Sequence, residues 1–169
     1  MRALVEQAER YEVALIVSNK PSAAGLTWAR ERGLPTWTLE SKGVARQDYD
    51  RQVSVALDSA GVGTIALAGY MRVLSGWFVN EWQDRIINIH PSLLPKYRGL
   101  DTHARALDAG DLTTGCSVHI VTEELDAGRV LGRAEVPILP DDNAASIEER
   151  VLAAEHSLYP RILSEFVKR

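Results

Sequence analysis

Two polar side chains lie two residues apart at the end of an apolar run. Asn88 and His90 alternate with Ile87 and Ile89 in the segment INIH, and Pro91 follows immediately. Because successive side chains of a strand point to opposite faces, Asn88 and His90 are expected to project from the same face. Proline cannot donate to a central ladder, so the strand is expected to end at His90. Open α/β sheets bind ligands at such strand ends.

A third candidate is Asp126, in the glycine-containing loop ELDAG between two expected strands. His119 lies on an expected strand face, where it either lines the site or is simply packed and hydrogen-bonded. A plainer interpretation also remains open, because an isolated N-x-H pattern is not specific. In it, Asn88 satisfies backbone groups of the next loop and His90 is a hydrogen-bonded histidine.

Composition excludes several classes of protein. The chain has 169 residues, 46% of them hydrophobic and 25% charged, which predicts one ordinary soluble domain. A net charge of -4 without a basic block argues against a nucleic-acid partner. The single Cys116 forms no internal disulfide, and no metal-ligand cysteine spacing occurs, which favours a reducing, cytoplasmic setting. No apolar run approaches the roughly 18 residues that cross a bilayer, so neither a membrane span nor a secretion signal is expected.

The first half of the chain alternates helical and strand patterns. The residue pattern predicts helices near 2–10, 22–32 and 46–60, and buried strands at 13–17 and 64–69. Such alternation favours a parallel sheet. The continuous apolar character of both strand segments predicts that they are covered on two faces.

The second half predicts an antiparallel edge and a long final helix. Strand-like segments at 115–122 and 129–139 flank the 123–128 loop and are expected to pair as a hairpin. The pattern from Ser146 to Glu149 resembles a capping box that opens the C-terminal helix. Pro160 is expected to bend that helix.

Four longer motifs carry a resemblance to a known family. They are LAGYMRVLS at 67–75, INIHPSLLPKYRGLDTH at 87–103, GCSVHIVTEELDAG at 115–128 and AEHSLYP at 154–160. In this order they resemble the phosphoribosylglycinamide formyltransferases, and the match runs from about residue 1 to the C-terminus. The resemblance implies an α/β, Rossmann-like formyltransferase fold, with a mostly parallel sheet, an antiparallel edge and flanking helices. It implies one domain over residues 1–169.

The resemblance also implies a reaction. The amine of glycinamide ribonucleotide attacks the formyl group of 10-formyltetrahydrofolate, in de novo purine biosynthesis, and a tetrahedral oxyanion forms. Asn88 and protonated His90 would donate to that oxyanion, and one such donor typically contributes about 2.7–4 kcal/mol. Asp126 would hold the charged form of His90 and relay a proton. Neither a metal nor a covalent nucleophile is expected.

Binding residues follow from the resemblance alone. The positions that match the folate pocket are Met71, Arg72, Val73, Leu74, Thr122, Glu123, Glu124, Leu125 and Asp126. Those that match substrate contacts are Arg46, Gly69, Asn88 and Glu155. Without the resemblance, Met71 and Leu74 would be ordinary core residues, and Arg46 and Glu155 would be solvated surface charges. The partners implied are small molecules, and the chain is expected to be a monomer or a homodimer.

One part of the family pattern has no counterpart here. Family members begin with a strand and a G-x-G-S-N type loop, whose amides hold the substrate phosphate. The segment MRALVEQA reads as the helix after that loop. We therefore expect the chain to be N-terminally incomplete relative to the family, lacking a central buried strand. Weak binding of the substrate phosphate would follow.

Other functions remain open at this point. Formyltetrahydrofolate deformylase, methionyl-tRNA formyltransferase and sugar-nucleotide formyltransferases share the Asn, His and Asp set, but usually carry additional domains. A non-catalytic folate-binding paralogue is the alternative from another class, and Asn88, His90 and Asp126 argue against it. A serine hydrolase is disfavoured because no G-x-S-x-G elbow occurs.

Overall fold

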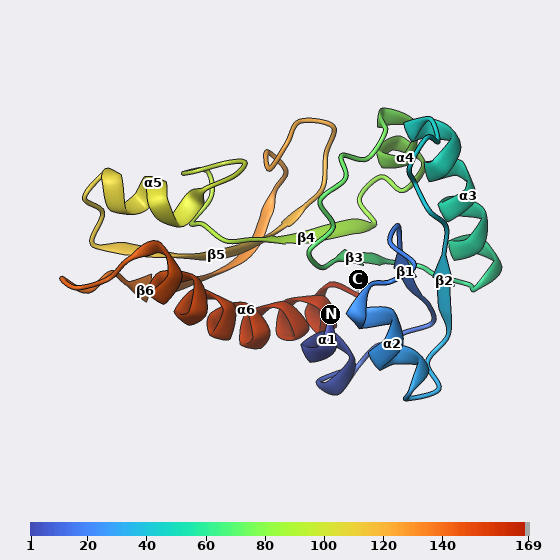
Figure 1. Ribbon diagram of the computed structural model, residues 1–169, viewed down its shortest axis with the longest axis horizontal. Coiled ribbons are helices and arrows are strands. Elements are labelled where there is room, and N and C mark those ends of the chain that lie inside the picture. Colours follow the sequence, from blue (N-terminus) through green and yellow to red (C-terminus); the bar gives the residue numbers. More distant parts are fainter. Residues whose placement is uncertain (168–169) are drawn as a thin grey trace.

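The computed structural model describes residues 1–167 as a mixed α/β fold (Figure 1). Its first half contains α1 (Arg2–Glu6), β1 (Ile16–Ser18), α2 (Ala24–Arg30), β2 (Thr36–Thr38), α3 (Arg46–Ser59) and β3 (Ile65–Leu67). Its second half contains α4 (Gly76–Glu81), β4 (Ile86–His90), α5 (Thr102–Asp108), β5 (Thr113–Ile120), β6 (Val130–Pro137) and α6 (Ala144–Phe166). The α/β class expected from the alternating pattern is confirmed.

The strands form two separate sheets within the described residues. β1 pairs with β2 in parallel, and the larger sheet has the order β3-β4-β5-β6. β3 and β4 are parallel, whereas β5 is antiparallel to both β4 and β6, so the expected hairpin edge is confirmed. The β4–β5 register places Asn88 opposite His119 and His90 opposite Ser117. Four polar side chains from two separate segments of the sequence thereby come to one region.

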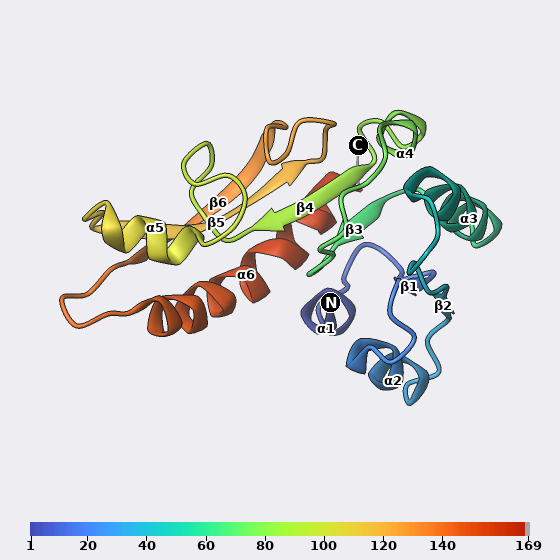
Figure 2. The ribbon, with the colours of Figure 1, turned by 45° about the horizontal axis from the view of Figure 1, so that its top comes forward.

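The helix α6 runs along the larger sheet and covers β5 and β6 (Figure 2). Ile147, Val151, Leu158 and Ile162 of α6 belong to the same buried cluster as Val118 of β5. The contact needs a glycine at 132, because a Cβ there would lie 2.6 Å from a methyl group of Ile162. Close packing of α6 fixes the hairpin that leads to the loop bearing Asp126.

The start of α6 differs from the sequence expectation. The N-cap is Asn143, whose side-chain oxygen accepts from the amides of Ala145 and Ser146. The Ser146 hydroxyl in turn accepts from the backbone amide of Asn143, which completes the capping box three residues earlier than expected. Asparagine is as good an N-cap as serine, so the pattern at Ser146 alone misplaced the helix start. The helix continues through Pro160 to Phe166.

The first strands are shorter and less buried than expected. β1 covers Ile16–Ser18 instead of 13–17, and β3 covers Ile65–Leu67 within 64–69. Most of their side chains are only half-buried, so the expectation of cover on two faces is wrong for both strands. The cause is a groove of about 940 Å³ that both strands line.

Backbone polar groups face this groove, which we call the β1–β3 groove. The amide of Ile16 donates to Pro35 beside β2, and the amide of Ile65 donates to Arg85 beside β4. Because successive backbone groups of a strand point to opposite edges, the amides of Val17 and Ala66 point away from those partners and toward the groove. Such unpaired strand edges are sites where another strand can add. No helix in residues 1–167 has the length and apolar character to cross a bilayer.

Candidate active site

Asn88 and His90 are positioned by β4, the strand that the sequence predicts. Ile86 and Ile87 are buried on this strand, and β4 ends at His90 as expected. Pro91 then begins the loop 91–101, which returns over the strand end. The strand end therefore holds both donor side chains against a buried support.

His90 is 5% exposed and has an oxygen acceptor at each ring nitrogen. Its Nε2 lies 2.9 Å from the carbonyl oxygen of Tyr97, and a carbonyl only accepts, so this nitrogen donates. Its Nδ1 lies 3.4 Å from Oδ2 of Asp126. His90 therefore faces an oxygen acceptor on both sides of its ring. The contact with Asp126 is longer than an ordinary hydrogen bond.

Asp126 lies between two histidines in the 121–129 loop. Its Oδ2 accepts from the amide of Gly99 at 2.9 Å, and its Oδ1 lies 3.5 Å from Nε2 of His119. Burial raises the pKa of the Asp126 carboxyl. The contact with His119, the hydrogen bond from Gly99 and the charge of His90 outweigh burial and hold that pKa below its ordinary value. The carboxylate is therefore ionised at neutral pH.

His119 is the residue that links Asn88 to Asp126. It is 2% exposed, and its Nδ1 lies 2.9 Å from the carbonyl oxygen of Ile120, so Nδ1 donates. Its Nε2 lies 3.3 Å from the amide nitrogen of Asn88 and 3.5 Å from Asp126. A neutral ring accepts from Asn88, whereas a charged ring donates to Asp126, and one Nε2 cannot do both. The lowered pKa of Asp126 corresponds to the second state, and the shorter Asn88 contact favours the first. We favour the neutral ring on distance.

Among the positions matched to the folate pocket, some side chains are exposed and others contact residues of the protein. Met71, Val73 and Leu125 are 76%, 55% and 59% exposed, so Met71 is no ordinary core residue. Leu74 packs at the edge of a buried cluster, as the simpler interpretation expects. Arg72 donates to the carbonyls of Ser41 and Val44 and lies over the Tyr49 ring.

The loop residues Thr122, Glu123 and Glu124 are exposed but have partners in the protein. Thr122 donates to the carbonyl of Glu124 at 3.0 Å. Glu123 accepts from Asn80 of α4 at 2.8 Å, and Glu124 pairs with Arg98 at 2.6 Å. These contacts tie the loop to its surroundings on two sides.

The positions matched to substrate contacts lie on separate elements. Arg46 is exposed at the first position of α3, and Gly69 follows β3 with a φ of 68°. Glu155 lies on α6, and its pKa is raised to about 7. Burial is the main cause; the N-terminal amine lowers the pKa and Glu148 raises it further. Glu155 is therefore not the solvated charge of the simpler interpretation. No contact among residues 1–167 joins Arg46 or Glu155 to Asn88, His90 or Asp126.

The sequence did not predict two backbone contacts of the site. The carbonyl of Tyr97 accepts from His90 and the amide of Gly99 donates to Asp126, so the loop 91–101 contributes two backbone groups to the site. Tyr97 and Gly99 both have positive φ angles, of 57° and 80°. Glycine in the YRG segment was the available signal, because glycine adopts such angles without strain.

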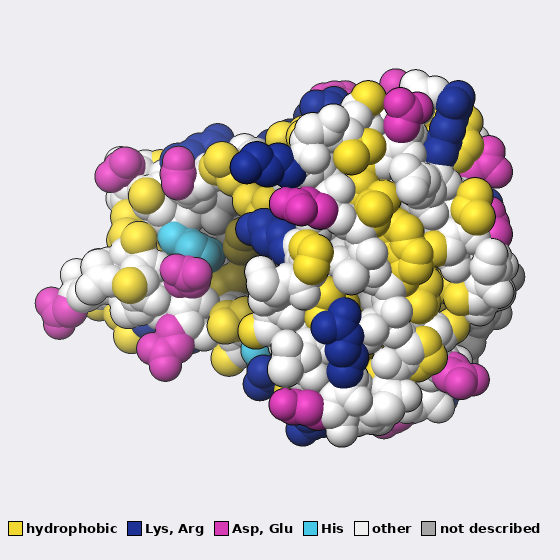
Figure 3. Space-filling model, turned by 45° about the vertical axis from the view of Figure 1, so that its right-hand side comes forward, with side chains coloured by type: hydrophobic (Ala, Val, Ile, Leu, Met, Phe, Trp, Pro, Cys, Tyr) yellow, Lys and Arg dark blue, Asp and Glu magenta, His cyan; other side chains and the backbone are white. Residues whose placement is uncertain are grey.

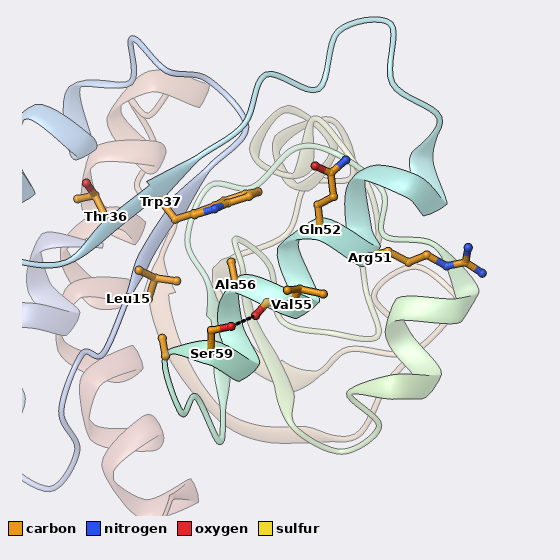
Figure 4. A pocket seen from close by; sticks show the side chains of 9 residues that line it. Leu15, Thr36, Trp37, Arg51, Gln52, Val55, Ala56 and Ser59 are labelled. Atoms are coloured by element: carbon orange, nitrogen blue, oxygen red, sulfur yellow. Dashed lines mark hydrogen bonds between the residues drawn. The ribbon is translucent and has the colours of Figure 1, made fainter.

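The surface carries further hollows. Figure 3 shows a hollow with hydrophobic side chains in its depth and Lys and Arg side chains at its rim. A separate groove of about 650 Å³ lies between β2 and α3, where Leu15 and Trp37 face Val55 and Ser59 (Figure 4). The lining of that groove includes none of the candidate site residues. In residues 1–167 no three His, Cys, Asp or Glu side chains cluster as metal ligands would.

The family described as "Formyl transferase" matches residues 1–163. The chain belongs to the formyl transferase family. This formyl transferase is 45% identical over 155 residues to the phosphoribosylglycinamide formyltransferase of Escherichia coli K12, covering 91% of its own length and 73% of that protein. It is 47% identical over 157 residues to the trifunctional purine biosynthetic protein adenosine-3 of Drosophila melanogaster. That match covers 92% of this chain and only 12% of the relative.

A solved structure agrees with the fold of this formyl transferase. The phosphoribosylglycinamide formyltransferase of Brucella melitensis superimposes with a TM-score of 0.91 at 44% identity, over 97% of this chain and 87% of that one. The similarity confirms the Rossmann-like formyltransferase fold expected from the four motifs.

Proposed function

We propose that this chain transfers the formyl group of 10-formyltetrahydrofolate to the amine of glycinamide ribonucleotide, in de novo purine biosynthesis. One observation carries the proposal. The Asp126 carboxylate lies between His90 and His119, at 3.4 and 3.5 Å, beside the Asn88 amide at the end of β4. We assign the roles of oxyanion donor to Asn88 and His90 and of proton acceptor to Asp126. The phosphoribosylglycinamide formyltransferases among the relatives supply the substrate class.

The reaction needs both the hydrogen-bond donors and the proton acceptor. The amine nitrogen bonds to the formyl carbon, and the carbonyl electron pair moves to oxygen. Asn88 donates its free N–H to that oxygen and His90 donates from Nδ1, each for about 2.7–4 kcal/mol of transition-state stabilisation. Asp126 accepts the proton of the attacking amine, directly or through water, and passes it to the folate nitrogen. That nitrogen takes the electron pair of the breaking C–N bond, so the formyl group changes carrier.

The proposed binding residues are those that match the family. For the folate we propose Met71, Arg72, Val73, Leu74, Thr122, Glu123, Glu124, Leu125 and Asp126. The exposure of Met71, Val73 and Leu125 supports this, because large apolar side chains left in contact with water are available for a ligand to cover. For the nucleotide substrate we propose Arg46, Gly69, Asn88 and Glu155. The proposal needs no metal, and it places the chain in the cytoplasm as a monomer or homodimer that acts as a single formyltransferase domain.

A coupled assay tests the proposal and separates it from its alternatives. The purified chain is mixed with 10-formyltetrahydrofolate, with and without glycinamide ribonucleotide, and both the formylated product and free formate are measured. Product that forms only with the acceptor supports the proposal. Formate released without the acceptor indicates a hydrolase, and folate binding without either product indicates a binding protein. Both results contradict the proposal.

A further inference from the structure

The loop 121–129 is attached to its surroundings by two consecutive glutamates. Glu124 pairs with Arg98, but both side chains are largely exposed, and such surface pairs contribute little. Glu123 instead accepts a hydrogen bond of 2.8 Å from Asn80 of α4. Both residues of this second contact are exposed as well, but it joins the loop to α4, whose Phe78 and Val79 are buried.

Gly76 gives an independent observation about the same contact. A Cβ built on Gly76 would lie 3.2 Å from the carboxylate carbon of Glu123, and 3.2 and 3.3 Å from its oxygens. The carboxylate therefore rests against the bare backbone at the first position of α4. A residue with a side chain at 76 would push it outward.

α4 is a firm support for this contact. Phe78 and Val79 are buried, and the Ser75 hydroxyl accepts from the Phe78 amide at the start of the helix. The amide of Ser75 donates to the buried carboxylate of Asp50 at 2.7 Å. Anything held on α4 is thus held against the core.

Glu123 lies three residues before Asp126. Three residues of extended chain span at most about 11 Å, so fixing Glu123 strongly restricts where Asp126 can lie. Asp126 also has a φ of 50°, a conformation that is uncommon for a residue other than glycine. Its carboxylate reaches His90 and His119 only if the loop is held in place.

We propose that Glu123 is a positioning residue, which rests on Gly76 and is held by Asn80 so that Asp126 reaches both histidines. Its relevance to turnover rests on the formyl transfer proposed above. The Glu123 carboxylate contributes nothing to the proton relay itself. It acts through the placement of Asp126.

The test combines Asn80→Asp with Glu123→Gln. Asn80→Asp sets two carboxylates against each other and displaces the loop, so kcat should fall about tenfold, or about 1.4 kcal/mol. In the Glu123→Gln background the amide of Gln can donate to Asp, so the same Asn80→Asp change should alter kcat less than twofold. Gln83→Glu adds an equal charge two residues beyond the end of α4 and is the matched control. Gly76→Ala should lower kcat by less than Asn80→Asp does, because the Glu123 carboxylate needs to move by only a few tenths of an ångström. It should not lower the melting temperature, because alanine favours helix.

A second readout does not depend on turnover. The carboxyl carbon of Asp126 is titrated by NMR in the same variants. Asn80→Asp should raise the pKa of Asp126 toward its ordinary value, and the added Glu123→Gln should lower it again. An equal loss of kcat in both backgrounds, or an unmoved Asp126 titration, overturns the proposal. If the parent chain folds but transfers no formyl group, the proposed function fails, and the titration still decides the role of Glu123.

Discussion

The amide nitrogen of Asn88 lies 3.3 Å from Nε2 of His119, directly across the β4–β5 ladder. Because Nδ1 of His119 donates to the backbone, its Nε2 is free to accept one hydrogen of the amide. The other N–H of Asn88 then faces the end of β4. A buried histidine thus orients the carboxamide to which we assign the oxyanion.

We expect His119→Phe to lower kcat about 10- to 100-fold, because a misoriented Asn88 loses one oxyanion donor. The KM for the folate should change little, since His119 is buried. Steady-state kinetics on the purified variant give both values. His156→Gln, at an exposed position of α6, is the control and should behave as the parent. A His119→Phe enzyme with parental kcat would show that Asn88 needs no such support.

Glu155 predicts a pH dependence of stability. Its pKa is raised from an ordinary value of 4.5 to about 7, chiefly by burial. Between these values the unfolded chain loses the proton that the folded chain keeps, so stability falls as pH rises from about 4.5 to 7 and is constant above. Glu155→Gln should remove this decline and, after allowance for solvent, stabilise the protein by about 1 kcal/mol at pH 8. Urea unfolding at pH 4.5 and pH 8 measures the free energy of unfolding of parent and variant. An equal change of this free energy between the two pH values in both proteins would contradict the assignment.

The β1–β3 groove predicts that the sheet accepts an added strand. Met1 lines the groove, so an apolar strand-forming segment joined ahead of Met1 through a short glycine turn can enter it. Burial of two large apolar side chains should raise the free energy of unfolding by at least about 3 kcal/mol. The amides of Val17 and Ala66 should become protected from hydrogen exchange. The same extension with two prolines in the strand is the control, and unchanged exchange at both amides in the apolar version would contradict the prediction.

The sequence predicts the site best where local rules apply. Side-chain alternation and Pro91 placed Asn88 and His90 together at the end of a strand, and the hairpin pattern placed Asp126 in the loop between β5 and β6. Periodicity and turn residues fix these features within a few neighbouring residues.

Features that depend on contacts between distant segments could not be predicted in this way. The positions of Tyr97 and Gly99 matter through backbone groups, which every residue carries. His119 gains its role only because the β4–β5 register sets it opposite Asn88. The contact of Glu123 with Asn80 joins residues 43 positions apart, and no local pattern marks either of them. β1 and β3 are only half-buried because a groove lies between the two sheets. A run of apolar residues in the sequence does not indicate such a groove.

Formyl transfer by this chain is proposed to depend on the proton acceptor between the two histidines, and Asp126→Asn tests that dependence most directly. The variant keeps the size of the side chain but loses the charge, so formyl transfer to glycinamide ribonucleotide should fall by about 100-fold or more, with folate affinity little changed. His90→Ala should show the same pattern. Single-turnover formyl transfer is measured for the parent and both variants at pH 7.5. Parental rates in both variants would contradict the account.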